Sequence, residues 1–114
     1  MIRRCATLLL FLGLLAVLPS SAHAATCAVP AYPTADGEYT SLKVTKVTCA
    51  EGLKVVKAFY TCRTKHGASG RCVSKVRGYA CQEQRSMTTP GEFTAKATCS
   101  KGKRKVAIGY RQTT

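Results

Sequence analysis

The sequence is poor in the residues on which most enzyme chemistry depends. Its 114 residues include only five acidic side chains and two histidines, and Asp36 is the only aspartate. General acid–base catalysis usually needs a histidine or a pair of carboxylates in one pocket. His23 lies in an N-terminal segment that we expect to be removed, and His66 lies among Gly, Ser and Lys residues typical of a solvated loop. We therefore assign no catalytic residue and expect that the protein is not an enzyme.

Patterns for metal and phosphate binding are also missing. No two cysteines have the C-x2-C spacing of a zinc site, and the segment Gly67-Ala-Ser-Gly70 lacks the Lys-Ser/Thr of a phosphate-binding loop. We therefore expect no metal and no cofactor. Beyond residue 24 there is no second long apolar run, so the rest of the chain is expected to be one domain without a transmembrane segment.

The N-terminus has the three parts of a secretory signal. Residues 1–4 carry two arginines, residues 5–18 are apolar apart from one threonine and one glycine, and residues 22–24 read Ala-His-Ala. The apolar run is short for a retained anchor, and no small residue directly precedes Cys27, as lipidation would need. We predict a signal peptide at residues 1–24, cleaved after Ala24 or alternatively after Ala25. Residues 25–114 would then form a single small domain that is secreted, with cell-wall association as an option.

Cleavage would change both the charge and the number of cysteines. Of 18 Lys and Arg, Arg3 and Arg4 are lost, which leaves 16 against five acids and a net charge of +11. Loss of Cys5 leaves six cysteines, and an even number in a short exported chain indicates three disulfides. A domain of this size buries little apolar surface, so cross-links worth roughly 2–4 kcal/mol each are a large part of its stability.

The first half of this domain has the pattern of an arm, a strand and a helix. Residues 25–37 are predicted to be an irregular arm, and residues 39–48 a strand whose phase slips at Thr45-Lys46. The spacing of Thr48 and Glu51 matches a capping box and predicts a helix from Cys49 to about Arg63. The predicted inward face carries Leu53, Val56, Phe59 and Tyr60. The predicted solvent face carries Lys54, Lys57, Thr61 and Arg63.

Three further strands are predicted in the second half. They cover residues 73–84, 93–99 and 106–110, with turns at residues 87–92 and 100–103. The order β-α-β-β-β predicts an α+β fold, with one helix packed on one face of an antiparallel sheet of three to four strands. The basic residues Lys96, Lys105 and Arg111 fall on the opposite face, which we expect to be solvated.

The pairing of the six cysteines has to be argued from geometry, because 15 pairings are possible. Two of them flank a glycine-containing loop at the predicted helix end and are expected to form a local bridge. A strand that returns along the helix would bring Cys81 level with Cys49. The next strand would carry its cysteine to the opposite end, within reach of the arm. We predict Cys62–Cys72, Cys49–Cys81 and Cys27–Cys99, with Cys49–Cys99 as the main competing pair.

Three short strings carry a resemblance to other proteins. They are Val47-Thr-Cys49-Ala, Val76-Arg-Gly-Tyr-Ala-Cys81 and Ala97-Thr-Cys99-Ser-Lys-Gly. Together they resemble a loose group of small secreted proteins of unknown function from high-GC Gram-positive bacteria, over residues 42–110. The resemblance implies export, the three cysteines in those strings and the strand–helix–meander order. It implies no activity and no site residues. Cys62 and Cys72 look like additions to this pattern.

Positive charge is the feature of the sequence that points to a function. The predicted hairpin carries Lys101, Lys103, Arg104 and Lys105, and the composition adds Lys65, Arg71, Lys75 and Arg77. Such clusters attract polyanions, including nucleic acid, acidic cell-wall polymers and anionic lipid headgroups. The aromatic residues take core positions of the pattern, which argues against a base-stacking surface. We predict a secreted, non-enzymatic domain that binds an anionic extracellular or cell-wall partner; the alternative is that the charge only keeps the protein soluble.

Two other classes of function stay open at this point. A cross-linked scaffold can present one rigid loop, so the chain could inhibit a secreted enzyme through residues 63–71 within the Cys62–Cys72 bridge. A secreted hydrolase, with a ribonuclease as the best match in size and charge, would have to use His66. We discount the hydrolase, because the sequence shows no recognisable partner for Glu83 or Glu92 and explains Glu51 by the capping box.

Overall fold

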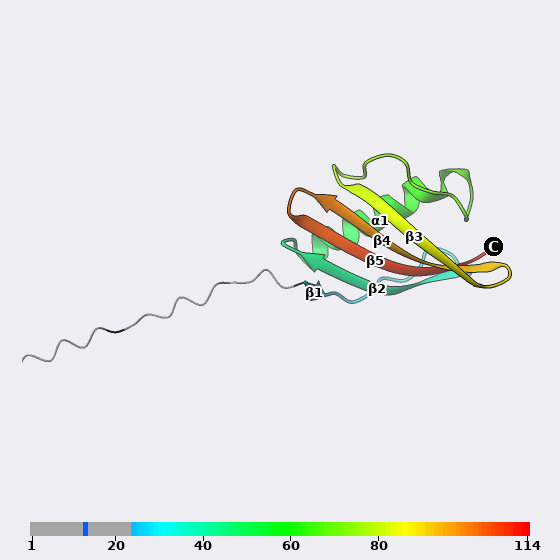
Figure 1. The fold of residues 1–114 in the computed structure, drawn as a ribbon, viewed down its shortest axis with the longest axis horizontal. Coiled ribbons are helices and arrows are strands. Elements are labelled where there is room, and N and C mark those ends of the chain that lie inside the picture. Colours follow the sequence, from blue (N-terminus) through cyan, green and yellow to red (C-terminus); the bar gives the residue numbers. More distant parts are fainter. Residues whose placement is uncertain (1–12, 14–23) are drawn as a thin grey trace, which may run out of the picture.

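The computed structural model describes Gly13 and residues 24–114, so the predicted signal peptide lies almost wholly outside the described residues. The described chain forms one antiparallel sheet with a helix across one of its faces (Figure 1). Its elements are β1 (Ala25–Thr26), β2 (Gly37–Thr45), α1 (Cys49–Arg63), a 3-10 turn (Thr64–His66), β3 (Ala80–Thr89), β4 (Glu92–Lys101) and β5 (Arg104–Thr113). The α+β class is as predicted, and β1 adds a fifth strand.

The order of the strands in the sheet decides which residues meet. The order is β1-β2-β5-β4-β3, with every neighbouring pair antiparallel. Strands β3, β4 and β5 follow one another as hairpins, while α1 carries the chain from β2 across the sheet to the far edge, where β3 lies (Figure 1). As a result, the end of β2, the start of β3 and the β4–β5 turn all lie at one end of the sheet.

Helix α1 begins and ends where the sequence predicts. The Thr48 hydroxyl accepts a hydrogen bond from the Glu51 backbone N–H (3.1 Å), which is one half of the expected capping box. The Glu51 carboxylate lies 3.7 Å from Arg77 instead of reaching back to Thr48. Gly52 is a poor helix former, but a Cβ there would lie 2.6 Å from Val44, so this glycine lets the helix pack closely on β2.

Arg63 lies inside the protein, whereas the helical pattern predicts that it faces water. Its side chain is only 2 % exposed. The guanidinium donates to the Ala68 carbonyl and to the Tyr32 hydroxyl (2.6 Å each), and it lies 4.4 Å from the centre of the Tyr110 ring. The arm, the loop after α1 and β5 surround the guanidinium with hydrogen-bond acceptors and the face of a ring. The helical pattern could not predict this burial, because these groups lie outside the helix.

The strand predicted at residues 73–84 begins only at Ala80. Val76 and Tyr79 exchange two backbone hydrogen bonds (2.9 and 2.7 Å) across Arg77 and Gly78. Both of these residues have positive φ angles, 50° and 83°, as a tight reversal requires. The chain therefore turns before it enters the sheet, and the segment before the turn is irregular. The strand predicted at residues 39–48 ends at Thr45, where the sequence shows its slip in phase, and the chain turns at Lys46, whose φ is 57°.

Two of the three predicted disulfide pairings are wrong. The structure contains the expected Cys62–Cys72 bridge, but it joins the remaining cysteines as Cys27–Cys49 and Cys81–Cys99. Cys49 starts α1 next to β2, whereas β3 is three strand spacings away, roughly 14 Å, so Cys49 and Cys81 cannot meet. Cys81 instead lies directly opposite Cys99 in the β3–β4 pair, and β1 holds the arm against β2 so that Cys27 reaches the start of α1.

Candidate functional site

The four predicted anion-binding residues lie together at the β4–β5 turn. Lys101 pairs with Arg104 across this hairpin, with Lys103 in the turn and Lys105 one residue further along β5. All four side chains are exposed. Lys105 is also paired with Thr45 at the end of β2, and this register brings Lys46 to the same end of the sheet.

Arg77 joins this group from a third segment. The Lys101 side chain crosses Gly78, with its ammonium 3.2 Å from the position that a Cβ of Gly78 would take, and it lies 5.9 Å from the Tyr79 ring centre. Arg77 precedes Gly78 and is exposed. We call the resulting group the cationic end; it consists of Lys46, Arg77, Lys101, Lys103, Arg104 and Lys105.

The other basic residues that the sequence analysis added to the cluster lie elsewhere. Lys65 follows the C-terminal end of α1, away from the β4–β5 turn. Arg71 lies 3.4 Å from the Glu83 carboxylate. Lys75 lines a shallow hollow with Lys57 and Lys65 beside α1. Sequence reasoning could not separate these lysines and arginines from Arg77, because their grouping depends on how the segment after α1 folds.

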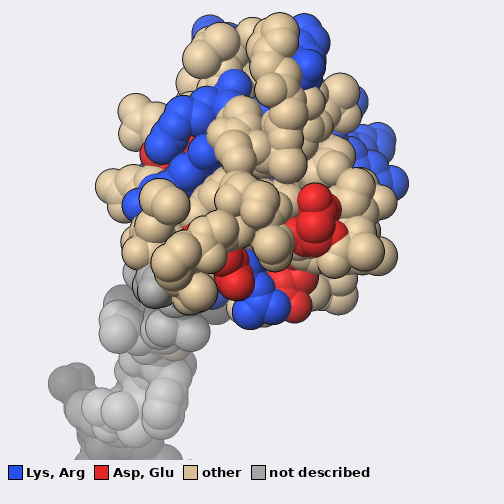
Figure 2. Space-filling model, turned by 90° about the vertical axis from the view of Figure 1, so that its right-hand side faces the viewer, with Lys and Arg blue, Asp and Glu red and all other residues tan. Residues whose placement is uncertain are grey.

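Most acidic residues lie at the end of the sheet opposite the cationic end. Glu51 is the acid that accompanies the cationic end, and it is 3.7 Å from Arg77. Asp36, Glu38 and Glu92 lie at the far end of the sheet, where Arg111 bonds Glu38 (2.6 Å) and Glu92 (3.0 Å). Figure 2 looks at this far end and shows acidic side chains there. The two ends are about 30 Å apart, because each long strand has ten residues at about 3.3 Å each.

The N-terminus of α1 adds to the field at the cationic end. The helix has 15 residues and begins at Cys49, close to Lys46 and on the same end of the sheet. Free backbone N–H groups give a helix N-terminus a partial positive charge. At this end of the sheet the six cations and the helix N-terminus attract anions together, and one paired acid, Glu51, opposes them.

His66, the candidate for a hydrolase, stands apart from the acids. It is exposed at the end of the 3-10 turn, and within residues 24–114 it takes part in no ion pair. Glu83, whose side chain is 8 % exposed, is occupied by Arg85 (2.7 Å), by Arg71 and by the Tyr110 hydroxyl. Burial, together with this hydrogen bond to Glu83, raises the pKa of Tyr110 well above its ordinary value.

The loop that the inhibitor hypothesis uses is fixed in place by arginines. Arg85 donates to the carbonyls of Ser69 (2.7 Å) and Gly70 (2.5 Å), and Arg63 donates to that of Ala68. The loop begins with the 3-10 turn at residues 64–66 and continues through Gly67 at a φ of 116°. Residues 64–66 are therefore not in the extended conformation in which a protease binds a peptide substrate.

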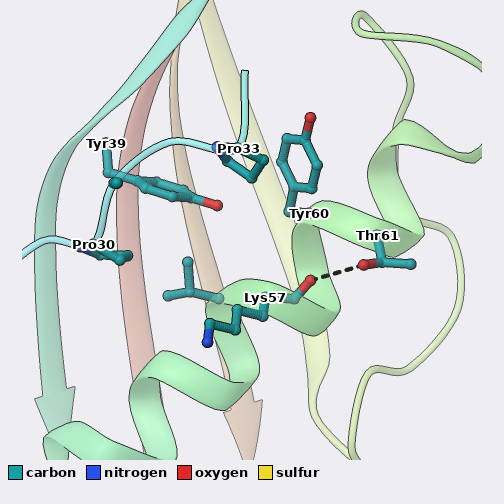
Figure 3. Close-up of a pocket in the computed structure, with 8 residues that line it drawn as sticks. Pro30, Pro33, Tyr39, Lys57, Tyr60 and Thr61 are labelled. Atoms are coloured by element: carbon teal, nitrogen blue, oxygen red, sulfur yellow. Dashed lines mark hydrogen bonds between the residues drawn. The ribbon is translucent and has the colours of Figure 1, made fainter. Parts of the chain in front are cut away.

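A cavity of about 380 Å³ lies between the arm and α1 (Figure 3). Figure 3 shows the Tyr39 hydroxyl pointing into it, with Pro30 and Pro33 on the arm and Lys57 and Tyr60 on the helix. Burial raises the pKa of Tyr39 well above its ordinary value. The volume fits only a small ligand.

No pattern in the sequence predicts this cavity. The Cys27–Cys49 bridge and Tyr32, which donates a hydrogen bond to Gln112 (2.5 Å), hold the arm in position above the helix. Both constraints join residues that are far apart in the sequence. The cavity is therefore a product of tertiary structure.

Within residues 24–114, no three His, Cys, Asp or Glu side chains are placed to hold a metal ion, and α1 is too short and too polar to cross a membrane. Comparison with known proteins finds no matching protein family, no similar curated protein and no similar solved structure.

Proposed function

We propose that this protein is an exported, non-enzymatic domain that binds an anionic polymer outside the cell through its cationic end. One observation carries the proposal: three segments that are distant in the sequence place six cations at one end of the sheet, with Glu51 as the accompanying acid. A charge that served solubility alone would not need to be gathered at one end, since dispersed charges repel other molecules equally well.

The exposure of these cations favours a polymer over a small anion. All six side chains are exposed and spread over the sheet end, and none of them lines the cavity beside the arm or the hollow beside α1. A small anion would touch only one or two such side chains, and exposed pairs of charges contribute little. A polymer engages many of them at once and releases its condensed counterions, which makes binding strong and dependent on salt.

Export is supported by the covalent structure. Three disulfides indicate an oxidising environment, since cytosolic thiols are kept reduced. The N-terminal pattern and the resemblance to small secreted proteins point in the same direction. Outside the cell, acidic polymers of the envelope are the abundant polyanions, and we take them as the partner class.

The other two hypotheses receive less support from the geometry. An inhibitor that mimics a substrate would need an extended segment, and residues 64–66 form a 3-10 turn. A hydrolase built on His66 would need a partner carboxylate, and the described acids are engaged elsewhere or lie apart from it.

The proposal is tested by neutralising the four basic residues at the β4–β5 turn, which we call the tip. We expect the variant Lys101→Gln/Lys103→Gln/Arg104→Gln/Lys105→Gln to bind heparin at least about tenfold more weakly, and to lower the slope of log K against log salt by about 3. The matched control, Lys54→Gln/Lys57→Gln/Lys65→Gln/Lys75→Gln, removes the same charge from exposed positions beside α1. It should keep most of the affinity. Affinity and slope are measured by titration at several salt concentrations.

Equal losses in the two variants would show that net charge, and not its position, governs binding. Unchanged heparin retention in the tip variant would show that these four residues do not contribute to binding. Either result would overturn the proposal. Circular dichroism and the denaturant midpoint of each variant establish that the comparison is between folded proteins.

A further inference from the structure

The face of the sheet opposite α1 is uncovered and almost free of large apolar side chains. Figure 1 shows that α1 lies behind the sheet and that no other element crosses the near face. On the central strand β5, the residues that point to this face include Ala107 and Gly109. A Cβ at Gly109 would lie 2.4 Å from the Ser41 hydroxyl oxygen and 2.6 Å from that of Thr40, so these hydroxyls occupy the space that glycine leaves.

Two hollows lie next to each other along this strand. One, of about 300 Å³, lies over Gly109 and includes Gln84 and Thr94; the other, of about 230 Å³, lies over Ala107 and includes Thr98. Ser41 and Lys96 line both of them. Together they form a shallow trough, which we call the β5 trough, with β2 on one side and β4 on the other.

Cations mark successive positions along the trough. The register of the sheet places Lys105 beside Thr45, then Lys43 beside Ala107, then Lys96 beside Gly109. Each step is two residues along a strand, or about 7 Å. Lys43 and Lys96 are exposed, lie on opposite sides of β5, and take part in no ion pair within residues 24–114. Sequence alternation predicts Lys96 and Lys105 on this face, and the structure confirms it.

The two ends of the trough differ in charge: one end adjoins basic residues, and the other adjoins a group with net negative charge. Lys105, a residue of the cationic end, lies two residues from Ala107 along β5 and points to the same face, so the cationic end adjoins the trough. At the other end, Arg111 is held by Glu38 and Glu92, and this group carries more negative than positive charge. An anionic chain would therefore be attracted over three rows of residues and repelled at the fourth.

The spacing of the rows fits a phosphodiester chain. A repeat of six backbone bonds, each about 1.5 Å long and arranged as an extended zigzag, advances about 7 Å between phosphates. Hydroxyl and amide groups of Ser41, Thr98 and Gln84 line the trough and can donate hydrogen bonds to phosphate and hydroxyl oxygens. Among residues 24–114, no aromatic ring points to this face, so nothing in the trough could stack a base.

We infer that the β5 trough binds a linear phosphodiester polymer without bases, of the polyol phosphate type, which enters from the cationic end and lies along β5. This inference rests on the proposed function and specifies its ligand. Lys105, Lys43 and Lys96 each face one phosphate. The small side chain of Ala107 leaves room for the chain, and over Gly109 the chain meets the hydroxyls of Ser41 and Thr40.

The test uses the mature protein and a synthetic oligomer of glycerol phosphate. We expect Lys43→Gln/Lys96→Gln to weaken binding at least about tenfold and to lower the salt slope by about 2. Ala107→Leu should weaken binding by a similar factor without a change in the slope, because it fills the trough and leaves the charge unaltered. The controls are Lys54→Gln/Lys57→Gln on α1 and Thr113→Leu, which lies on the same face beyond the trough. Each should change the affinity by less than about twofold.

The outcomes separate this inference from the proposed function. If the tip variant loses affinity while both trough variants match their controls, the trough is not the path, and the proposed function stands. If the wild-type protein binds neither heparin nor the oligomer, both fail. Tighter binding of a single-stranded oligonucleotide, or of a polyuronate with the same number of charges, would overturn the assignment to a base-free phosphodiester.

Discussion

Arg63 lies in the last turn of α1 with its guanidinium enclosed by groups from three other segments. No carboxylate is within ion-pair distance of it in the described residues; the charge is held by a carbonyl, a phenol oxygen and the face of Tyr110. Gln112, also buried, lies 3.5 Å from Arg63 and accepts from Tyr32. These contacts tie the arm, the helix end and β5 together, so one side chain supports three elements.

Replacing Arg63 should therefore destabilise the protein more than replacing an exposed arginine. We expect Arg63→Ala to lower the free energy of unfolding by about 2–4 kcal/mol, because it leaves a void and removes the hydrogen bonds to the Ala68 carbonyl and the Tyr32 hydroxyl. The control is Arg111→Ala, whose side chain is 46 % exposed and whose loss should cost less than about 1 kcal/mol. Urea denaturation measures both, and equal losses would contradict the structural role of Arg63.

At the residue scale, alternation predicts exposure well where a side chain belongs to one strand. Phe93, Ala95, Ala97 and Cys99 are buried as predicted, and Lys96 is exposed. The prediction fails at Arg63 because a long polar side chain can be buried when distant segments supply its acceptors. Those acceptors are 5 residues away at Ala68 but 31 residues away at Tyr32, and no local pattern connects the latter pair.

Local sequence patterns predict the boundaries of some elements better than those of others. Both boundaries of α1 follow from its cap and from the glycine-rich loop beyond it, so the predicted range is correct. The start of β3 depends on the reversal at Arg77-Gly78, which alternation alone does not show. The sheet order depends on α1 crossing to the far edge, and an error at that step led to two wrong disulfide pairings.

The disulfide pattern gives a direct check on the arrangement of the elements. Proteolysis of the unreduced protein should yield linked peptides for Cys27–Cys49, Cys62–Cys72 and Cys81–Cys99, identified by mass spectrometry. Cleavage after Lys43, Lys57, Arg71, Lys75 and Lys96 places each of the six cysteines in a fragment of its own. Reduced and alkylated protein is the control. A Cys49–Cys81 or Cys49–Cys99 peptide would contradict the sheet order described above.

At the scale of the whole molecule, charge is separated along the strands. The cationic end has six basic residues accompanied by Glu51, and three of the five acids lie at the other end. Such a charge distribution orients the protein as it approaches an anionic surface, with the β4–β5 turn leading. The same arrangement places like charges close together, which opposes folding.

Stability should therefore rise when charge at the tip is removed. We expect Lys103→Gln/Arg104→Gln to raise the free energy of unfolding by about 0.5–1 kcal/mol at low salt. The gain should shrink in about 0.5 M NaCl, because salt then limits the repulsion between exposed charges to a few ångströms. Lys54→Gln/Lys65→Gln, which removes two well-separated charges, should gain less. Urea denaturation at both salt concentrations measures these changes. A lower free energy of unfolding in Lys103→Gln/Arg104→Gln would contradict the prediction that the basic side chains repel one another.

The sequence alone determined the fold class, the helix boundaries, the hairpins of the second half and the cluster at Lys101–Lys105, because each depends on residues within a few turns or strands of one another. Tertiary structure alone decided the disulfide partners of Cys27 and Cys81, the burial of Arg63, the addition of Lys46 and Arg77 to the cationic end, and the trough along β5. These features join segments separated by tens of residues, and the contacts that hold such segments together arise only when the helix packs on the sheet and sets the order of its strands.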